Sequence, residues 1–209
     1  MTTLIAIVGG VFAITFLAAP TLGGGWYWDA GNAIGFAALA GMLTLGVTSS
    51  RRLNLRAHQQ LGYGVLALAA LHAFWFLLGD PVAAEFLKPG APGYMWLGVA
   101  ALLLLAVLVV VALTPDRQRL HADYASFRYW HRLLAVTAVA AATYHIVVSD
   151  FYLRAWYQVL LFVVLVAATG ITRIRWLRSA ELPTASATAF LATSAVFIAL
   201  FTIVRSALA

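Results

Sequence analysis

The sequence predicts an all-α fold, a polytopic membrane helical bundle. Three observations support this prediction: 64% of the 209 residues are hydrophobic, only 10% are charged, and the mean hydropathy is +0.94. Soluble domains carry about 25% charged residues. The apolar segments are rich in Ala, Leu and Val without strict alternation, which favours helices over the strands of a membrane β-barrel.

Seven segments qualify as membrane-spanning helices, which need about 20 mostly apolar residues each. In chain order they are residues 3–19, 30–48, 57–78, 95–113, 129–148, 155–171 and 187–208. The first segment ends at Ala18, Ala19 and Pro20, as a signal peptide can, but no Lys or Arg precedes its apolar run, so we favour a retained helix. The longest connections, 79–94 and 114–128, are too short for an extramembrane catalytic domain.

Basic residues gather in alternate loops and predict the orientation of the bundle. The first group is Arg51, Arg52 and Arg56, the second is Arg117, Arg119, Arg128 and Arg132, and the third is Arg173, Arg175 and Arg178. The positive-inside rule places these loops and the N-terminus in the cytoplasm. Because topology explains the net charge of +6, we expect a membrane lipid environment and no nucleic acid as a partner.

Four histidines form two pairs inside two predicted spans, His58 with His72 and His131 with His145. The members of each pair are 14 residues apart, close to four helical turns, so both rings face the same way about 21 Å apart along the axis. Both spans run outward in the predicted topology. His58 and His131 are therefore expected near the cytoplasmic face, and His72 and His145 nearer the outer face.

The matched depths predict two b-type haems, one between each pair of facing histidines. Two axial imidazoles leave no open position on the iron, which suits electron transfer. The absence of cysteine excludes iron–sulfur clusters, thiolate sites and covalent c-type attachment. Small residues between the histidines leave room for a porphyrin or, equally, allow close helix packing. They are Gly62, Val65 and Ala69 in the third segment and Ala135, Ala138, Ala141 and Ala142 in the fifth.

Other interpretations of the histidines remain open. A membrane histidine can simply form a hydrogen bond to a neighbouring helix. A metal-ion permease would line its path with polar groups, whereas the faces between these histidines are apolar. Bare zinc or copper needs ligands that converge on one point, but four turns separate the members of each pair. A purely structural membrane subunit gives no reason for matched histidines.

Several basic residues are candidates for the haem propionates. Arg56, Arg128 and Arg132 lie close to the predicted inner pair, where arginine binds anionic groups well, although topology alone also explains them. At the outer face, Lys88 and Arg154 are weaker candidates for the same role or for docking a partner.

The remaining histidine, His121, lies among charged loop residues and is interpreted as a solvated side chain. No dinucleotide-binding G-x-G-x-x-G and no phosphate-binding G-x-x-x-x-G-K-[ST] occurs, and no catalytic residue is predicted. Reducing equivalents are therefore expected from another molecule.

Two stretches resemble the ferric reductase-like transmembrane domain family, which includes ferric reductases, NADPH oxidases and the haem-binding membrane subunit of the periplasmic methionine sulfoxide reductase system. They are His58 to Leu78, HQQLGYGVLALAALHAFWFLL, and Phe127 to Val148, FRYWHRLLAVTAVAAATYHIVV. The resemblance implies that His58, His72, His131 and His145 are axial haem iron ligands. It covers six spans, so we expect a six-helix, di-haem domain at 1–171, followed at 172–209 by a cytoplasmic basic loop and an additional seventh helix.

The resemblance also implies a transmembrane oxidoreductase or electron-transfer subunit in a bacterial inner (plasma) membrane. Electrons would pass from a cytoplasmic flavin reductase or quinol to a periplasmic or extracellular acceptor: ferric iron, oxygen or a redox protein. Oxidases and ferric reductases of the family usually continue into a flavin and nicotinamide domain, where this chain has a further span. A separate reductase partner, bringing flavin or quinone, is therefore expected. The alternative is a quinone-linked membrane cytochrome b.

Overall fold

The computed structural model describes residues 2–16, 25–47, 55–114, 123–172 and 186–208, which are almost entirely helical and contain no strand. The helices are α1 (Thr2–Phe16), α2 (Gly25–Val47), α3 (Leu55–Gly79), the short 3₁₀ helix η1 (Pro81–Leu87), α4 (Gly93–Leu113), α6 (Tyr124–Ser149), α7 (Trp156–Thr172) and α8 (Ala187–Leu208). All seven α-helices lie on the segments predicted to span the membrane. The prediction of an all-α, polytopic membrane bundle is confirmed.

Five described helices, α2, α3, α4, α6 and α8, are long and apolar enough to cross a membrane. The chain is therefore an integral membrane protein. The first and sixth predicted segments form shorter apolar helices, because α1 has 15 described residues and α7 has 17. Within the described residues, five of the seven predicted segments thus reach the length of a membrane span, and the other two form shorter apolar helices.

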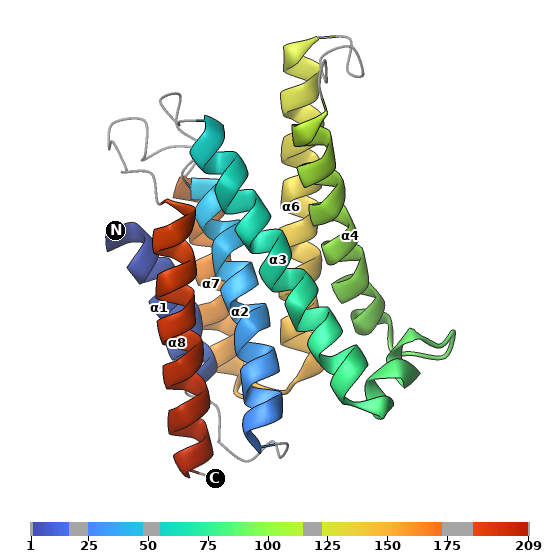
Figure 1. The fold of residues 1–209 in the computed structure, drawn as a ribbon, viewed down its shortest axis with the longest axis vertical. Helices are drawn as coiled ribbons and strands as arrows, with labels where there is room; N and C mark the ends of the chain where they lie inside the picture. Colours follow the sequence, from blue (N-terminus) through green and yellow to red (C-terminus); the bar gives the residue numbers. More distant parts are fainter. Residues whose placement is uncertain (1, 17–24, 48–54, 115–122, 173–185, 209) are drawn as a thin grey trace.

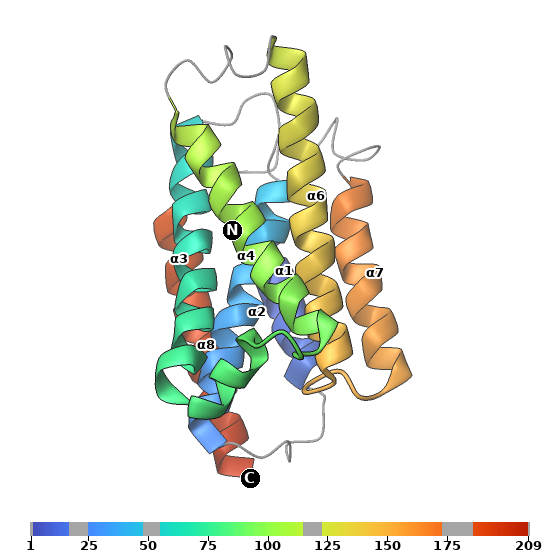
Figure 2. The same ribbon diagram turned by 90° about the vertical axis from the view of Figure 1, so that its right-hand side faces the viewer.

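The helices form one elongated bundle (Figure 1). α4 and α6 lie side by side on one flank, α1 and α8 lie on the opposite flank, and α2 and α3 stand between them. Figure 2 shows α7 beside α6 on the far side from α3. We call the end that holds η1, the start of α2 and the C-terminus the His72 end, and the opposite end the His58 end.

α2 is the most buried of the five long helices and packs against α1, α3, α6, α7 and α8. Small residues allow α2 to lie this close to its neighbours. At Gly41, for example, a Cβ atom would lie only 2.4 Å from Val65 Cγ2 of α3 and 2.7 Å from Phe190 Cζ of α8. Close approach through small residues is the usual way in which membrane helices associate. α8 thus packs against α2 as an integral helix of the bundle, while the division of the chain at residue 171 stays a prediction.

Large apolar side chains are exposed on the outward faces of the bundle, for example Phe74 on α3, Val110 on α4 and Val136 on α6. Such apolar faces suit contact with lipid, and the main-chain polar groups along the middle of each helix are already paired within it.

Asp side chains cap the N-termini of two helices near the histidines. Asp80 Oδ1 accepts a hydrogen bond from Val82 N at the start of η1, and Asp123 Oδ1 accepts one from Ser126 N at the start of α6. α6 ends at Ser149, and the left-handed backbone of the following residue, Asp150 (φ 57°), turns the chain toward α7. These contacts fix the start of η1 and both ends of α6, and hence the positions of His131 and His145 along the bundle.

Candidate functional site

His58, in the first turn of α3, lies close to His131, about two turns into α6. Their ring centroids are 6.4 Å apart and their planes meet at 54°. A metal–imidazole bond is about 2 Å long, and the nitrogen lies about 1 Å from its ring centre. Two rings on opposite sides of one ion would therefore have centroids about 6 Å apart. The Phe127 ring packs against His131, with centroids 5.6 Å apart.

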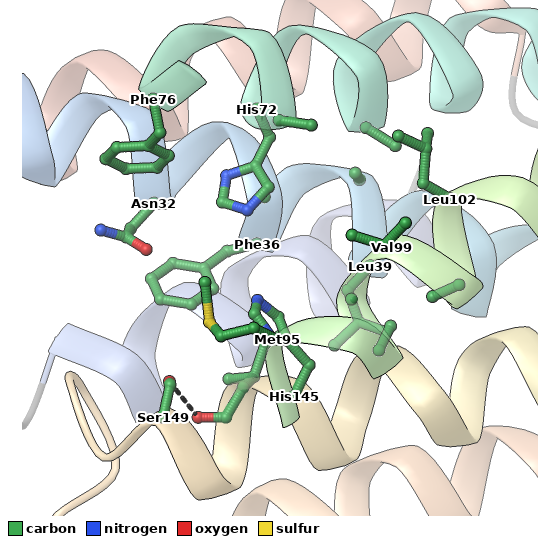
Figure 3. A pocket seen from close by; sticks show the side chains of 18 of the residues that line it. Asn32, Phe36, Leu39, His72, Phe76, Met95, Val99, Leu102, His145 and Ser149 are labelled. Atoms are coloured by element: carbon green, nitrogen blue, oxygen red, sulfur yellow. Dashed lines mark hydrogen bonds between the residues drawn. The ribbon is translucent and has the colours of Figure 1, made fainter. Parts of the chain in front are cut away.

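His72 and His145 face a shared cavity at the other end of the same two helices (Figure 3). The Nδ1 atom of His72 lies 2.8 Å from Gly31 O of α2, and the Nδ1 atom of His145 lies 2.9 Å from Tyr94 O of α4. A carbonyl oxygen can only accept, so each Nδ1 carries the proton and donates it. Each Nε2 atom is then left with the lone pair that binds a metal.

The cavity between these rings has a volume of about 210 Å³ and is lined mainly by apolar residues. α2 contributes Asn32, Gly35, Phe36, Ala38, Leu39 and Met42, α3 contributes Ala69, His72, Ala73, Phe76 and Leu77, and α4 contributes Met95, Gly98, Val99, Ala101, Leu102 and Leu105. α6 contributes Ala142, His145, Ile146 and Ser149, while η1 closes the cavity at the His72 end. Large apolar pockets with a few convergent polar groups are typical of cofactor sites.

The small residues that lie between the histidines in the sequence have different surroundings in the structure. Ala69 and Ala142 line the cavity. Val65 instead lies where a side chain on Gly41 of α2 would be, so it serves helix packing. Both interpretations of the small residues therefore apply, at different positions.

Sequence reasoning missed the contribution of α2 and α4, which supply the carbonyl groups that bind the His72 and His145 rings. The spacing of Gly31 and Gly35 is a small-x-x-x-small pattern, a signal of close helix approach that could have drawn attention to α2. A tyrosine carbonyl at position 94 has no such signal, because any residue provides a carbonyl.

A second missed feature is a buried ion pair beside the cavity. Arg205 Nε of α8 lies 2.9 Å from Asp29 Oδ1 of α2, and Tyr152 Oη donates a hydrogen bond of 2.8 Å to the same oxygen. The Arg205 guanidinium also lies over the Tyr152 ring, 4.8 Å from its centre. Burial, together with the Asp29 carboxylate, raises the pKa of the Tyr152 phenol, so this group stays a hydrogen-bond donor. Tyr152 lines the cavity, and the ion pair therefore stands directly behind it.

The predicted propionate ligands are on the surface. Arg56, Arg128 and Arg132 are exposed at the His58 end, and the Arg128 guanidinium lies over the Tyr124 ring, 4.9 Å from its centre. At the His72 end, Lys88 pairs with Glu85 at 2.6 Å on the surface, and Arg154 is exposed. His121 lies outside the described residues, so its predicted loop position stays a prediction.

The described residues contain no group of three or more His, Asp or Glu side chains arranged to hold a metal ion. The four histidines thus remain two separate pairs, as their spacing predicts. A pair supplies only two ligands, so a metal at either pair needs further ligands from another source.

A family model described as "Ferric reductase like transmembrane component" matches residues 48–142. The match includes His58, His72 and His131 and ends just before His145. No curated protein and no solved structure shows a significant similarity to the chain. The match confirms the resemblance of this chain to the ferric reductase-like transmembrane family and indicates a transmembrane oxidoreductase.

Proposed function

We propose that this protein carries electrons across a membrane through two b-type haems, from a cytoplasmic donor to an acceptor on the outer side. His58 and His131 would hold the haem nearer the cytoplasm, and His72 and His145 the haem nearer the outer side. One observation carries the proposal: both outer rings turn Nδ1 to a main-chain carbonyl and present Nε2 to the same cavity.

The residues present fit a haem at each pair. A haem brings four nitrogens of its own, so each histidine pair would supply the two protein ligands that its iron still needs. The apolar outer cavity suits a porphyrin face, and the 6.4 Å separation of the His58 and His131 rings suits two ligands on opposite sides of one ion. Bound haem would supply a centre that accepts and donates one electron.

The protein's own groups would orient the ligands and exclude water. The Gly31 and Tyr94 carbonyls fix the tautomer of His72 and His145 and make each Nε2 a stronger ligand. The apolar lining keeps the outer cavity at low dielectric, which strengthens the effect of nearby charges on the redox potential.

The distribution of charge supports the proposed orientation in a bacterial inner membrane. The described residues of the His58 end include the exposed cations Arg56, Arg128 and Arg132. The connections of the His72 end carry both signs, with Asp80, Glu85, Lys88, Asp150 and Arg154. Cytoplasmic loops carry the excess of arginine, so the His58 end would face the cytoplasm. The donor would then be a flavin reductase or a quinol, and the acceptor ferric iron, oxygen or a periplasmic redox protein.

The proposal is tested with the full chain purified in detergent. We expect a b-type reduced-minus-oxidised spectrum and two haems per polypeptide. His72→Ala should leave one haem, while the matched control His121→Ala, at the remaining histidine, should keep both. A colourless wild-type protein would overturn the proposal, as would an unchanged haem content in His72→Ala.

Transfer itself is measured in lipid vesicles with ferricyanide trapped inside and dithionite outside. Wild-type protein should reduce the trapped ferricyanide, and His72→Ala should not. Equal rates in vesicles with and without protein would rule out a transmembrane path. Reduction of the haems by a short-chain quinol or by reduced flavin then identifies the class of donor.

A further inference from the structure

The two outer histidines occupy equivalent positions in two similar helix pairs. In the first pair, His72 of α3 contacts the carbonyl of Gly31 on α2, and Gly35 follows one turn later. In the second, His145 of α6 contacts the carbonyl of Tyr94 on α4, and Gly98 follows one turn later. In both pairs, the helix that precedes the histidine supplies a carbonyl at one position and a glycine four residues further on.

Both glycines lie directly against the imidazole rings. A Cβ atom at Gly35 would lie 2.8, 2.9 and 3.1 Å from Nδ1, Cε1 and Cγ of His72. At Gly98 the corresponding distances to the same atoms of His145 are 3.0, 3.1 and 3.1 Å. Similar distances to three adjacent ring atoms place the missing methyl group over the face of each ring. Each imidazole therefore rests on a helix backbone that has no side chain at that point.

Other helical glycines of the chain do not have this contact. A Cβ atom at Gly46, also on α2, would meet nothing within 4 Å, and one at Gly62 on α3 would meet only Val109 Cγ2 at 4.0 Å. Gly31 and Gly41 are also tightly packed, but against Phe76 and Val65, so among the described glycines the close contact with a histidine ring is specific to Gly35 and Gly98.

We propose that Gly35 and Gly98 are positioning residues that set the rotation of the His72 and His145 rings at the outer haem. The carbonyl directs Nδ1, and the flat backbone at the glycine admits the ring in one orientation, so that Nε2 points into the cavity. A methyl group at either position would push the ring away from its carbonyl and rotate its plane. This inference rests on the proposed haem ligation and assigns two further residues to it.

The test uses Gly35→Ala and Gly98→Ala, with Gly46→Ala and Gly170→Ala as matched controls, because a Cβ atom at either control position would meet nothing within 4 Å. The readouts are haem content and the low-spin ferric EPR signal, which depends on the orientation of the two ligand rings. We expect each test variant either to lose the outer haem, leaving one per chain, or to shift its EPR signal while the inner signal stays. Both controls should retain two haems and the wild-type signals. Wild-type signals in both test variants would overturn the inference.

If Gly35→Ala does not accumulate in cells, comparing a double variant with His72→Ala shows whether the added methyl group acts through the His72 ring. If the methyl group of Gly35→Ala acts through the His72 ring, then Gly35→Ala/His72→Ala should accumulate as well as His72→Ala alone. Loss of the double variant in cells that retain His72→Ala would overturn the inference. Haem-free wild-type protein would instead overturn the proposed function, so the two failures are distinct.

Discussion

The His72–His145 pair and the His58–His131 pair stand at opposite ends of the same two helices, in different surroundings. At the His72 end, carbonyl groups of α2 and α4 bind the imidazoles, and an apolar cavity separates the rings. At the His58 end, the two rings lie 6.4 Å apart, beside Phe127 and close to exposed arginines. The His72 and His145 rings are thus oriented by neighbouring helices, whereas the His58 and His131 rings lie near the surface charge of the protein.

This difference indicates separate roles for the protein around each pair. At the His72 end the main chain and the buried ion pair fix geometry, so changes there should alter haem binding or the stability of the bundle. At the His58 end exposed cations act through solvent, where charge effects are small and are screened by salt. Substitutions at the two ends should therefore differ in their effects, and the largest effect is expected at the histidines themselves.

Removing one histidine from each pair should abolish different redox components. We expect His145→Ala to lose the outer haem and His131→Ala to lose the inner one, because each change removes one of only two axial ligands. Both should stop transfer across vesicles. A redox titration followed by visible spectroscopy measures which component remains. Loss of the same component in both variants would show that the histidines are not paired by depth.

The buried ion pair should be the most sensitive part of the outer region after the histidines. Arg205→Ala would leave the Asp29 carboxylate buried without its cation, and breaking such a pair costs about 3–5 kcal/mol. The midpoint of thermal unfolding in detergent should therefore fall markedly. Arg154→Ala, which removes an exposed arginine at the same end, should change the free energy of unfolding by less than about 0.5 kcal/mol.

A double variant separates the ion pair from other effects of Arg205. Asp29→Ala/Arg205→Ala removes both charges, so it should be less destabilised than the sum of the two single changes. If the single and double effects simply add, the 2.9 Å contact contributes no coupling and the cluster does not hold α8 against α2.

Much of the fold could be predicted because membrane helices are encoded locally. Length and hydropathy locate each helix, and the 14-residue spacing places two histidines on one face without any tertiary information. The lengths of α1 and α7 were harder to predict, since both segments were close to the minimum length needed to span a bilayer.

The surroundings of the histidines could not be predicted in the same way. Asp29 and Arg205 are 176 residues apart, and their contact depends on how α8 packs against α2. The Gly31 and Tyr94 carbonyls are main-chain groups, which leave no trace in the residue type that bears them. The candidate ligands could thus be identified from the sequence, whereas the groups that orient them could be identified only once the packing of α2, α3, α4 and α6 was known.

The smallest effect is expected at the His58 end, from Arg128→Gln. Removing a cation near a redox centre makes its reduction less favourable, so the midpoint potential of the inner haem should fall. Arg128 is exposed, and exposed charges contribute at most about 1 kcal/mol, which corresponds to roughly 40 mV for one electron. The shift should shrink further at high salt, and the outer haem should keep its potential. A redox titration at two ionic strengths measures both components. If the midpoint potential of the outer haem shifted more than that of the inner haem, the exposed Arg128 would not act mainly on the His58 end.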